Sequence, residues 1–180
     1  MLAVSGPSGV GKTTLRQALR ARDGRFENVA AFTTRPIRPG DSDRLHISDQ
    51  EMDRLISSEH CIGVNDVYGA RYATPVRPIT DVVRQGKVAV LDWPCDRIGE
   101  LRSTFRAECA VVYLIPPNSR VLRERLTADT RDPSGERLRL AIEELYRIRA
   151  SGYAHVDHVL TTASDPRELA RVVEQLLANA

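Results

Sequence analysis

The chain has 180 residues, 42% of them hydrophobic and 28% charged, which is typical of one soluble globular domain. Its 26 basic and 24 acidic residues nearly balance, and this argues against a nucleic-acid-binding protein, which usually carries a concentrated basic face. No run of 18 apolar residues occurs, so we expect no membrane span, and the three cysteines lack the close spacing of a zinc site.

The first third of the chain is predicted to begin with a strand, a glycine-rich loop and a helix. Leu2–Ser5 is a short apolar run typical of a buried strand, and Lys12–Ala21 has the apolar spacing of a helix. A second strand is expected over Asn28–Phe32. Ser48 is then the expected N-cap of a helix that runs to about Ser58.

The rest of the chain continues this alternation after one irregular stretch. Cys61–Tyr72 is expected to be extended and irregular, and Thr74-Pro75 to open a helix that stops at Gly86. Further strands are predicted over Val88–Asp92, Ala110–Ile115 and His158–Leu160, and further helices over Asp96–Phe105, Ser119–Ala128, Glu136–Ala150 and from the cap Asp165 to about Leu177.

Strands that alternate with helices of this length indicate an α/β fold with a mainly parallel sheet. The stretch 32–84 breaks the alternation, so we expect it to form a small inserted lobe. The prediction is therefore a single domain over 1–180, with a core made of 1–31 and 85–180.

The segment Gly6–Thr13 reads G-P-S-G-V-G-K-T and matches the pattern G-x-x-x-x-G-K-[ST] between a predicted strand and a predicted helix. Glycines let the backbone turn tightly enough to aim its N–H groups at a phosphate, Lys12 reaches the β- and γ-oxygens, and Thr13 can ligate Mg²⁺. The sequence thus predicts that ATP and Mg²⁺ bind to Gly6, Ser8, Gly9, Val10, Gly11, Lys12, Thr13 and Thr14.

Asp92 ends the predicted strand Val88–Asp92. A carboxylate at the carboxyl end of a parallel strand lies at the edge where such sheets bind ligands. We therefore expect Asp92 to contact the substrate or Mg²⁺; the alternative is an aspartate that caps a helix or turn.

Two motifs together resemble the guanylate kinase family. The loop Gly6–Thr13 resembles that family's P-loop sequence, and Phe32–Gly40 is similar to its T-T-R-x-x-R-x-G turn. The resemblance implies a three-layer P-loop NTPase fold with an inserted substrate-binding lobe over about 32–84 and a helical lid over about 127–139. It also implies that Arg35 and Arg38 grip the phosphate of the acceptor, because two guanidinium forks in one turn can clamp a dianion.

The resemblance assigns roles to further residues on the lobe and the lid. Tyr72 and Thr74 echo the family's tyrosine-glycine-threonine segment, so Tyr72 would bind the acceptor phosphate and Thr74 its base or sugar; simple packing and capping is the alternative. Arg131 and Arg137 of the lid, with Arg139 and Arg125 as further candidates, would place positive charge over the transferring phosphoryl group. Together with Lys12, Arg131 and Arg137 are the expected catalytic residues.

Four positions depart from the family's pattern. Ala31, Gly63 and Pro94 stand where the family has polar residues that read guanine or hold the acceptor, and Arg44 replaces a tyrosine that helps to hold the acceptor phosphate. Arg44 would suit an acceptor with more phosphate groups. The acceptor is therefore expected to be GMP or a similar nucleotide, with a ribose 1,5-bisphosphate phosphokinase or a nucleotide kinase of specialised metabolism as alternatives.

A non-catalytic guanylate-kinase-like binding module is the alternative of a different class, but such modules have lost the phosphate loop that this chain retains. An ATPase or GTPase switch is disfavoured because no N-K-x-D motif is found. We expect a cytoplasmic monomer or homodimer whose partners are small phosphorylated molecules, with no nucleic acid and no membrane among them. Cys61, Cys95 and Cys109 are expected to be reduced and to act as small hydrophobic residues.

Overall fold

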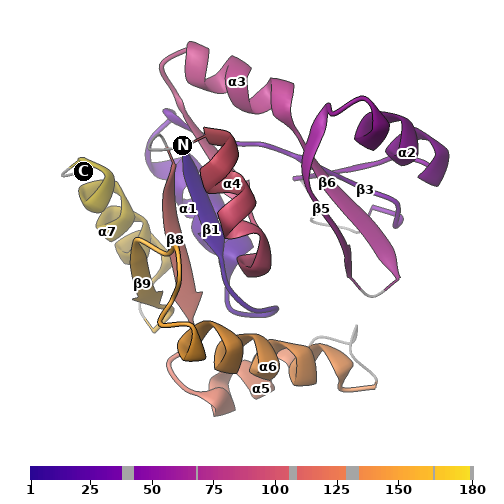
Figure 1. Ribbon diagram of the computed structural model, residues 1–180. Coiled ribbons are helices and arrows are strands. Elements are labelled where there is room, and N and C mark those ends of the chain that lie inside the picture. The colour runs from indigo at the N-terminus through magenta and orange to yellow at the C-terminus, as the bar shows by residue number, and fades with distance from the viewer. Residues whose placement is uncertain (38–42, 68, 106–108, 129–133, 164, 179–180) are drawn as a thin grey trace.

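A computed structural model describes residues 1–37, 43–67, 69–105, 109–128, 134–163 and 165–178. In these ranges a central sheet is built from parallel strands in the order β2-β7-β1-β8-β9 (Figure 1). Its strands are β1 (Leu2–Ser5), β2 (Phe26–Asn28), β7 (Val88–Asp92), β8 (Ala110–Ile115) and β9 (His158–Thr161). The predicted α/β fold with a mainly parallel sheet is confirmed.

Helices cover both faces of the central sheet. On one face α1 (Lys12–Arg22) packs beside α7 (Pro166–Ala178), and their apolar side chains join those of β1 and β8 in one core cluster. On the other face α3 (Val76–Arg84) and α4 (Ile98–Phe105), the latter preceded by a 3₁₀ turn at Cys95–Arg97, bury a second cluster around Trp93. A sheet that helices cover on both faces needs strands with apolar side chains on both faces.

A smaller sheet stands beside the core (Figure 1). It has the strand order β4-β3-β6-β5, formed by β3 (Ala31–Thr33), β4 (Arg44–His46), β5 (Cys61–Val67) and β6 (Ala70–Pro75). The helix α2 (Asp49–Ser57) buries Met52 against this sheet, and its N-cap Ser48 accepts a hydrogen bond from the Glu51 backbone, as predicted. This sheet and α2 fall within the stretch that breaks the alternation in the sequence.

Two sequence-based element predictions were wrong in this region, and a third was incomplete. The segment Asn28–Phe32 is divided between two sheets, with Asn28 ending β2 and Ala31 starting β3. The stretch after Cys61 is extended, as predicted, but it forms an antiparallel hairpin of β5 and β6 with a register shift between Ile62 and Asn65. The next helix starts at Val76, since Thr74 and Pro75 belong to β6.

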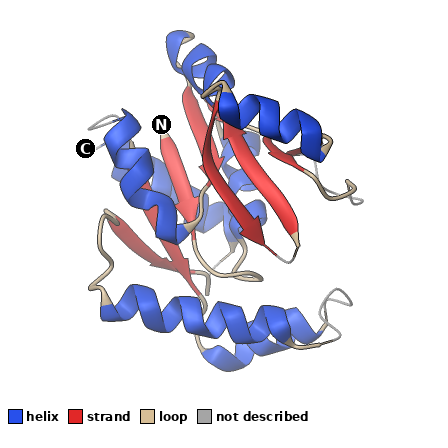
Figure 2. Cartoon of the chain, turned by 45° about the vertical axis from the view of Figure 1, so that its right-hand side comes forward, coloured by secondary structure: helices blue, strands red, loops and turns tan. Residues whose placement is uncertain are grey.

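The helices α5 (Ser119–Thr127) and α6 (Glu136–Ala150) lie together below the central sheet in Figure 2. Leu122, Leu126 and Ala141 form the buried contact between them. Asn118 caps α5 by accepting a hydrogen bond from the Val121 backbone N–H. None of the helices in the described ranges is both long and apolar enough to cross a membrane.

Candidate active site at the carboxyl edge of the central sheet

The phosphate loop lies where β1 ends and α1 begins. Gly6 has a φ of 138°, and a Cβ there would lie 2.6 Å from the Leu114 carbonyl oxygen. The loop can therefore run this close to β8 only because residue 6 has no side chain. The first turn of α1 contains no acidic residue, which leaves the positive end of the helix available to an anion. Lys12 Nζ donates hydrogen bonds to the Gly6 oxygen at 2.6 Å and the Pro7 oxygen at 3.2 Å, which holds the ammonium group over the loop.

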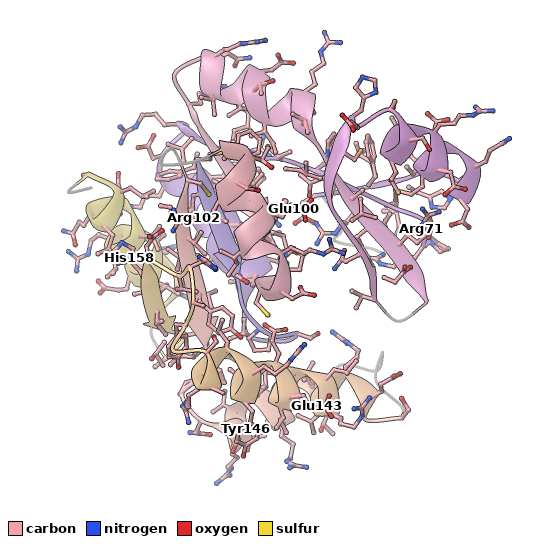
Figure 3. All side chains as sticks on the ribbon, in the orientation of Figure 1. Arg71, Glu100, Arg102, Glu143, Tyr146 and His158 are labelled. Atoms are coloured by element: carbon pink, nitrogen blue, oxygen red, sulfur yellow. The ribbon has the colours of Figure 1, made fainter. Side chains whose placement is uncertain are left out.

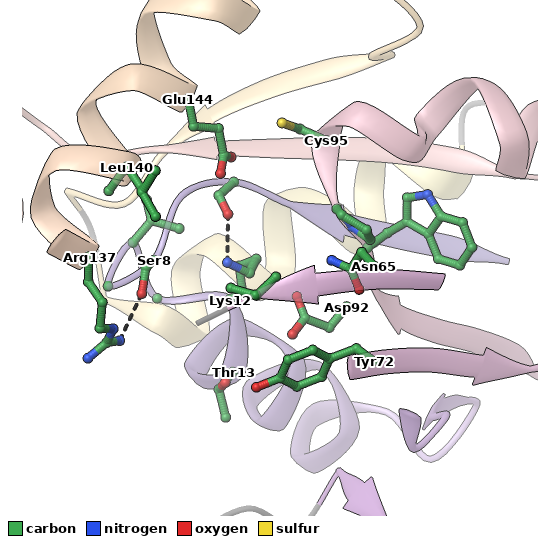
Figure 4. Close-up of a pocket in the computed structure, with 18 of the residues that line it drawn as sticks. Ser8, Lys12, Thr13, Asn65, Tyr72, Asp92, Cys95, Arg137, Leu140 and Glu144 are labelled. Carbon is green, nitrogen blue, oxygen red and sulfur yellow. Dashed lines mark hydrogen bonds between the residues drawn. The ribbon is translucent and has the colours of Figure 1, made fainter. Parts of the chain in front are cut away.

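One pocket of about 1260 Å³ opens in front of this loop and reaches the small sheet and α6 (Figure 4). Its volume exceeds the roughly 300–1,000 Å³ that is usual for a site holding one small molecule. It therefore has room for two ligands. The predicted site residues that line it are Gly6, Ser8, Gly9, Val10, Gly11, Lys12, Thr13, Thr14, Arg35, Arg44, Tyr72, Thr74, Asp92 and Arg137. Arg38 and Arg131 lie outside the described residues.

Asp92 points into this pocket from the end of β7 and forms an ion pair with Arg44 of β4. Burial alone would raise the pKa of Asp92, but the positive charges of Lys12, Arg44 and Arg16 outweigh it and lower the pKa to about 2. The carboxylate is thus ionised at any physiological pH. Asp43 is the second acidic neighbour of Arg44, 3.6 Å away, so the charge of Arg44 is shared between two carboxylates.

Tyr72 of β6 brings the two arginines of the small sheet together. Arg35 Nε donates a hydrogen bond to the Tyr72 hydroxyl at 3.0 Å. The guanidinium carbons of Arg35 and Arg44 lie 6.0 and 5.9 Å from the centre of the tyrosine ring. Two cationic groups are therefore held beside one phenol at the wall of the pocket.

The helices α5 and α6 supply the opposite wall. Arg137 donates a hydrogen bond to Ser8 Oγ at 2.8 Å, and Arg125 donates to the Val10 oxygen at 3.0 Å, so both reach the phosphate loop. Arg139 does not line the pocket here: its side chain is 59% exposed and pairs with Glu143 on the outer face of α6 (Figure 3). One helical turn separates Arg139 from Glu143, and this spacing favours the surface ion pair.

Sequence reasoning missed Arg16 and Asp43. Arg16 lies on α1 one turn after Lys12, is 1% exposed, and forms an ion pair with Asp43 just before β4. Its Nε and Nη2 atoms have no hydrogen-bond partner among the described residues. The signal in the sequence was weak: a charged residue beside Leu15 on the helix face that packs into the core.

Three of the four positions that depart from the family pattern line the pocket with apolar residues. Ala31, Gly63 and Pro94 line it with no polar side chain. Trp93 is 1% exposed and lies over Gly63, with its indole N–H bonded to the Arg97 oxygen at 2.8 Å. The Gly63 backbone N–H donates to Glu100 of α4 at 2.9 Å, and Figure 3 shows Glu100 on the helix side that faces the small sheet.

The thiol of Cys95 also lines the pocket, beside Glu144. Burial, together with the charges of Glu144 and Asp96, raises the pKa of Cys95 to about 12, so the thiol stays protonated and is no nucleophile. Cys61 and Cys109 are buried free cysteines, as predicted for small hydrophobic residues. Within the described ranges no cluster of three histidine, cysteine or acidic residues is present that could hold a metal ion by itself.

Comparison with known proteins agrees with this geometry. The guanylate kinase family model matches residues 1–163. The chain is 29% identical to the guanylate kinase of Carboxydothermus hydrogenoformans, over 98% of this chain and 89% of that one. It is 36% identical to the guanylate kinase of Symbiobacterium thermophilum, over 78% of this chain and 68% of the relative. The crystal structure of guanylate kinase from Anaplasma phagocytophilum shares the fold, with a TM-score of 0.76 and 24% identity over 99% of this chain and 84% of that chain. The chain belongs to the guanylate kinase family.

Proposed function

We propose that this protein is an ATP-dependent kinase that transfers the γ-phosphoryl group to a nucleoside monophosphate, with GMP as the acceptor that its relatives' name indicates. The observation that carries the proposal is the convergence of Lys12, Arg35, Asp92 and Arg137 on one pocket from four separate parts of the chain. Phosphoryl transfer needs little besides positioned cations and carboxylates around the phosphates.

ATP would bind with its β- and γ-phosphates in the loop from Gly6 to Thr14. Lys12 would leave the carbonyl oxygens of Gly6 and Pro7 and bond the phosphate oxygens, which are better acceptors for an ammonium group. The hydroxyl of Thr13 and the carboxylate of Asp92 are oxygen ligands of the kind Mg²⁺ prefers, and both line the pocket. When bound there, Mg²⁺ would neutralise charge on the phosphates.

The acceptor phosphate would bind on the side of the small sheet. Arg35 is already oriented by Tyr72, and Arg38 follows it by three residues in the same sequence motif. The Tyr72 hydroxyl, which accepts from Arg35, keeps its own proton to donate to a phosphate oxygen. Thr74 is 5% exposed and lines the pocket on the same strand, within the part that would hold the nucleoside.

We propose a core of 1–31 and 85–180, an acceptor lobe of about 32–84 whose last helix, α3, packs on the central sheet, and a lid of about 127–139. Arg137 and Arg131 would stabilise the charge on the phosphoryl group during transfer, and Arg125 would support the loop from beneath. The lobe and the lid would close over the two substrates and keep water from the γ-phosphoryl group.

The alternative of a sugar bisphosphate acceptor rested on the extra charge of Arg44. Because Arg44 is held by ion pairs with Asp43 and Asp92, it is less available to a second phosphate group, and a nucleoside monophosphate is the better match. The two acceptors are separable in one assay.

The test is ADP release from Mg-ATP in the presence of GMP, dGMP, AMP, CMP, UMP or ribose 1,5-bisphosphate. We expect the fastest release with a guanine nucleotide and none that is dependent on ribose 1,5-bisphosphate. Acceptor-dependent release with ribose 1,5-bisphosphate alone would refute the nucleotide assignment. No acceptor-dependent release at all, together with no thermal stabilisation by Mg-ATP, would favour a non-catalytic binding module.

A further inference from the structure

Asn65 is a polar side chain in the pocket that no motif identifies. In the hairpin of β5 and β6 it stands directly opposite Tyr72. Residues paired in this way have their side chains on the same face of a sheet, so Asn65 faces the pocket together with Tyr72. Figure 4 shows the Asn65 amide near Asp92, on the side of the pocket away from the lid residue Arg137.

An irregularity in β5 brings Asn65 to this place. The register of the hairpin shifts between Ile62 and Asn65, and Gly63 within the shift has φ of 64°. An added Cβ at Gly63 would lie 2.7 Å from Cη2 of Trp93. The indole therefore fills the space that a side chain at position 63 would enter, and the next residue to face the pocket is Asn65. Such bulges often re-aim a side chain beside a binding site.

The Asn65 amide has no hydrogen-bond partner among the residues that the structure describes, although the side chain is partly buried. The pocket is also lined by Ala31, Gly63, Ala73 and Pro94, whose side chains offer no hydrogen bonds, whereas Asn65, like Tyr72, Thr74 and Asp92, offers a polar side chain. Asp66, the next residue, is exposed and stands opposite Arg71. A partly buried amide without a partner usually finds one in a ligand or in water.

We propose that Asn65 reads the base of the acceptor, and that it recognises 6-oxopurine nucleotides as a class. The inference rests on the proposed function. An amide offers one acceptor and one donor side by side, so it can accept from N1–H of the purine and donate to O6. GMP and IMP present this same edge. A carboxylate would instead require two donors, N1–H and the 2-amino group, which only GMP has.

The test compares kcat/KM for GMP and for IMP. In the wild-type chain the two values should lie within about 3-fold, because the amide makes no bond to the 2-amino group. In Asn65→Asp the ratio of GMP to IMP should rise to about 10–100, since the carboxylate can pair with both N1–H and the 2-amino group of guanine, whereas IMP offers it N1–H alone. Asn65→Ala should lower both values by about 5–50-fold and leave the ratio near that of the wild type.

Gln85→Ala, which removes an exposed carboxamide after α3, is the matched control and should change neither value. A wild-type preference for GMP over IMP above about 30-fold, or an unchanged ratio in Asn65→Asp, overturns the assignment. Calorimetry gives the dissociation constants for GMP and IMP, and their ratio tests the role of Asn65 independently of catalysis. Binding that follows the predicted ratios without any turnover would refute the kinase proposal and keep Asn65 as the base reader; absence of binding by both nucleotides would overturn both.

Discussion

Lys12 is the residue on which the proposed chemistry depends most. Its ammonium group sits over the phosphate loop and bonds to two backbone oxygens there. Lys12→Ala should lower kcat by about 10²–10³-fold or more, because one positioned charge at the transferring group is removed. The fold should remain, since the lysine bonds only to the surface of the loop.

The other lysine of the chain provides the control. Lys87 pairs with Glu27 at the far end of the central sheet, and both side chains are about two-fifths exposed, at 38% and 41%. Lys87→Ala should leave kcat unchanged. Full activity in Lys12→Ala, measured with thermal unfolding to verify the fold, would contradict the role of the loop.

Gly63 tests the packing beneath the proposed base reader. Gly63→Ala should destabilise the chain through two effects: φ of 64° is unfavourable for alanine, and the new methyl group would overlap Trp93. Gly86→Ala measures the backbone effect alone, because Gly86 has a similar φ of 72° and an added Cβ there would have no atom within 4 Å. Measured by urea unfolding, Gly86→Ala should lower the unfolding free energy by about 1 kcal/mol. Gly63→Ala should lower it by roughly 1–3 kcal/mol more. Equal losses of unfolding free energy in the two variants would show that Trp93 moves aside for the new methyl group without destabilising the chain.

Asp92 should make stability depend on pH in a defined window. Its pKa in the folded chain, about 2, lies below the ordinary value of 3.8, so folding favours the ionised form. The stabilisation is complete above about pH 4 and is lost as the pH falls towards 2. The unfolding free energy of the wild type should exceed that of Asp92→Asn by an amount that shrinks by about 2 kcal/mol between pH 4 and pH 2. Urea unfolding at several pH values measures this, and a constant difference would refute the ionic environment described for Asp92.

At the scale of the element, the α1–β4 junction is held by the buried pair of Arg16 and Asp43. Asp43→Asn would leave Arg16, 1% exposed, without its counter-charge. We expect a loss of about 3–5 kcal/mol in unfolding free energy, because an uncompensated buried charge is costly. Glu124→Gln, which breaks the exposed pair of Arg120 and Glu124 on α5, should cost less than about 0.5 kcal/mol. Similar losses for the two variants would contradict the account of the junction.

The sequence sufficed for elements with a strong local pattern. The strands β1, β7 and β8 were predicted at their observed bounds because each is a short apolar run that ends at a turn. The phosphate loop was predicted because its chemistry depends on residue types in fixed order. The hairpin of β5 and β6 was not, since Gly63 and the register shift interrupt the alternation that marks a strand.

Contacts between distant elements were the second kind of feature that the sequence could not supply. The pairs formed by Arg16 with Asp43 and by Arg44 with Asp92 join residues 27 and 48 positions apart. No local pattern identifies such partners, and arginine is abundant throughout this chain. The same limit explains Arg139, which belongs to the expected lid segment but turns outward to Glu143.

At the scale of the whole molecule, the pocket of about 1260 Å³ is bounded by the core, the small sheet and α6. No one of these parts encloses it, so a reaction inside it depends on how the three meet. This arrangement suits the joining of two separate substrates, with the phosphate loop on one side and Arg35 and Tyr72 on the other.

The most direct test of the central claim is to follow the label from [γ-³²P]ATP in the presence of Mg²⁺ and GMP. The account predicts that the label appears in GDP, in an amount equal to the ADP formed, and that Lys12→Ala forms both products at least about 10²-fold more slowly. Label released only as inorganic phosphate would show hydrolysis without transfer and would contradict the claim, as would the absence of any ADP.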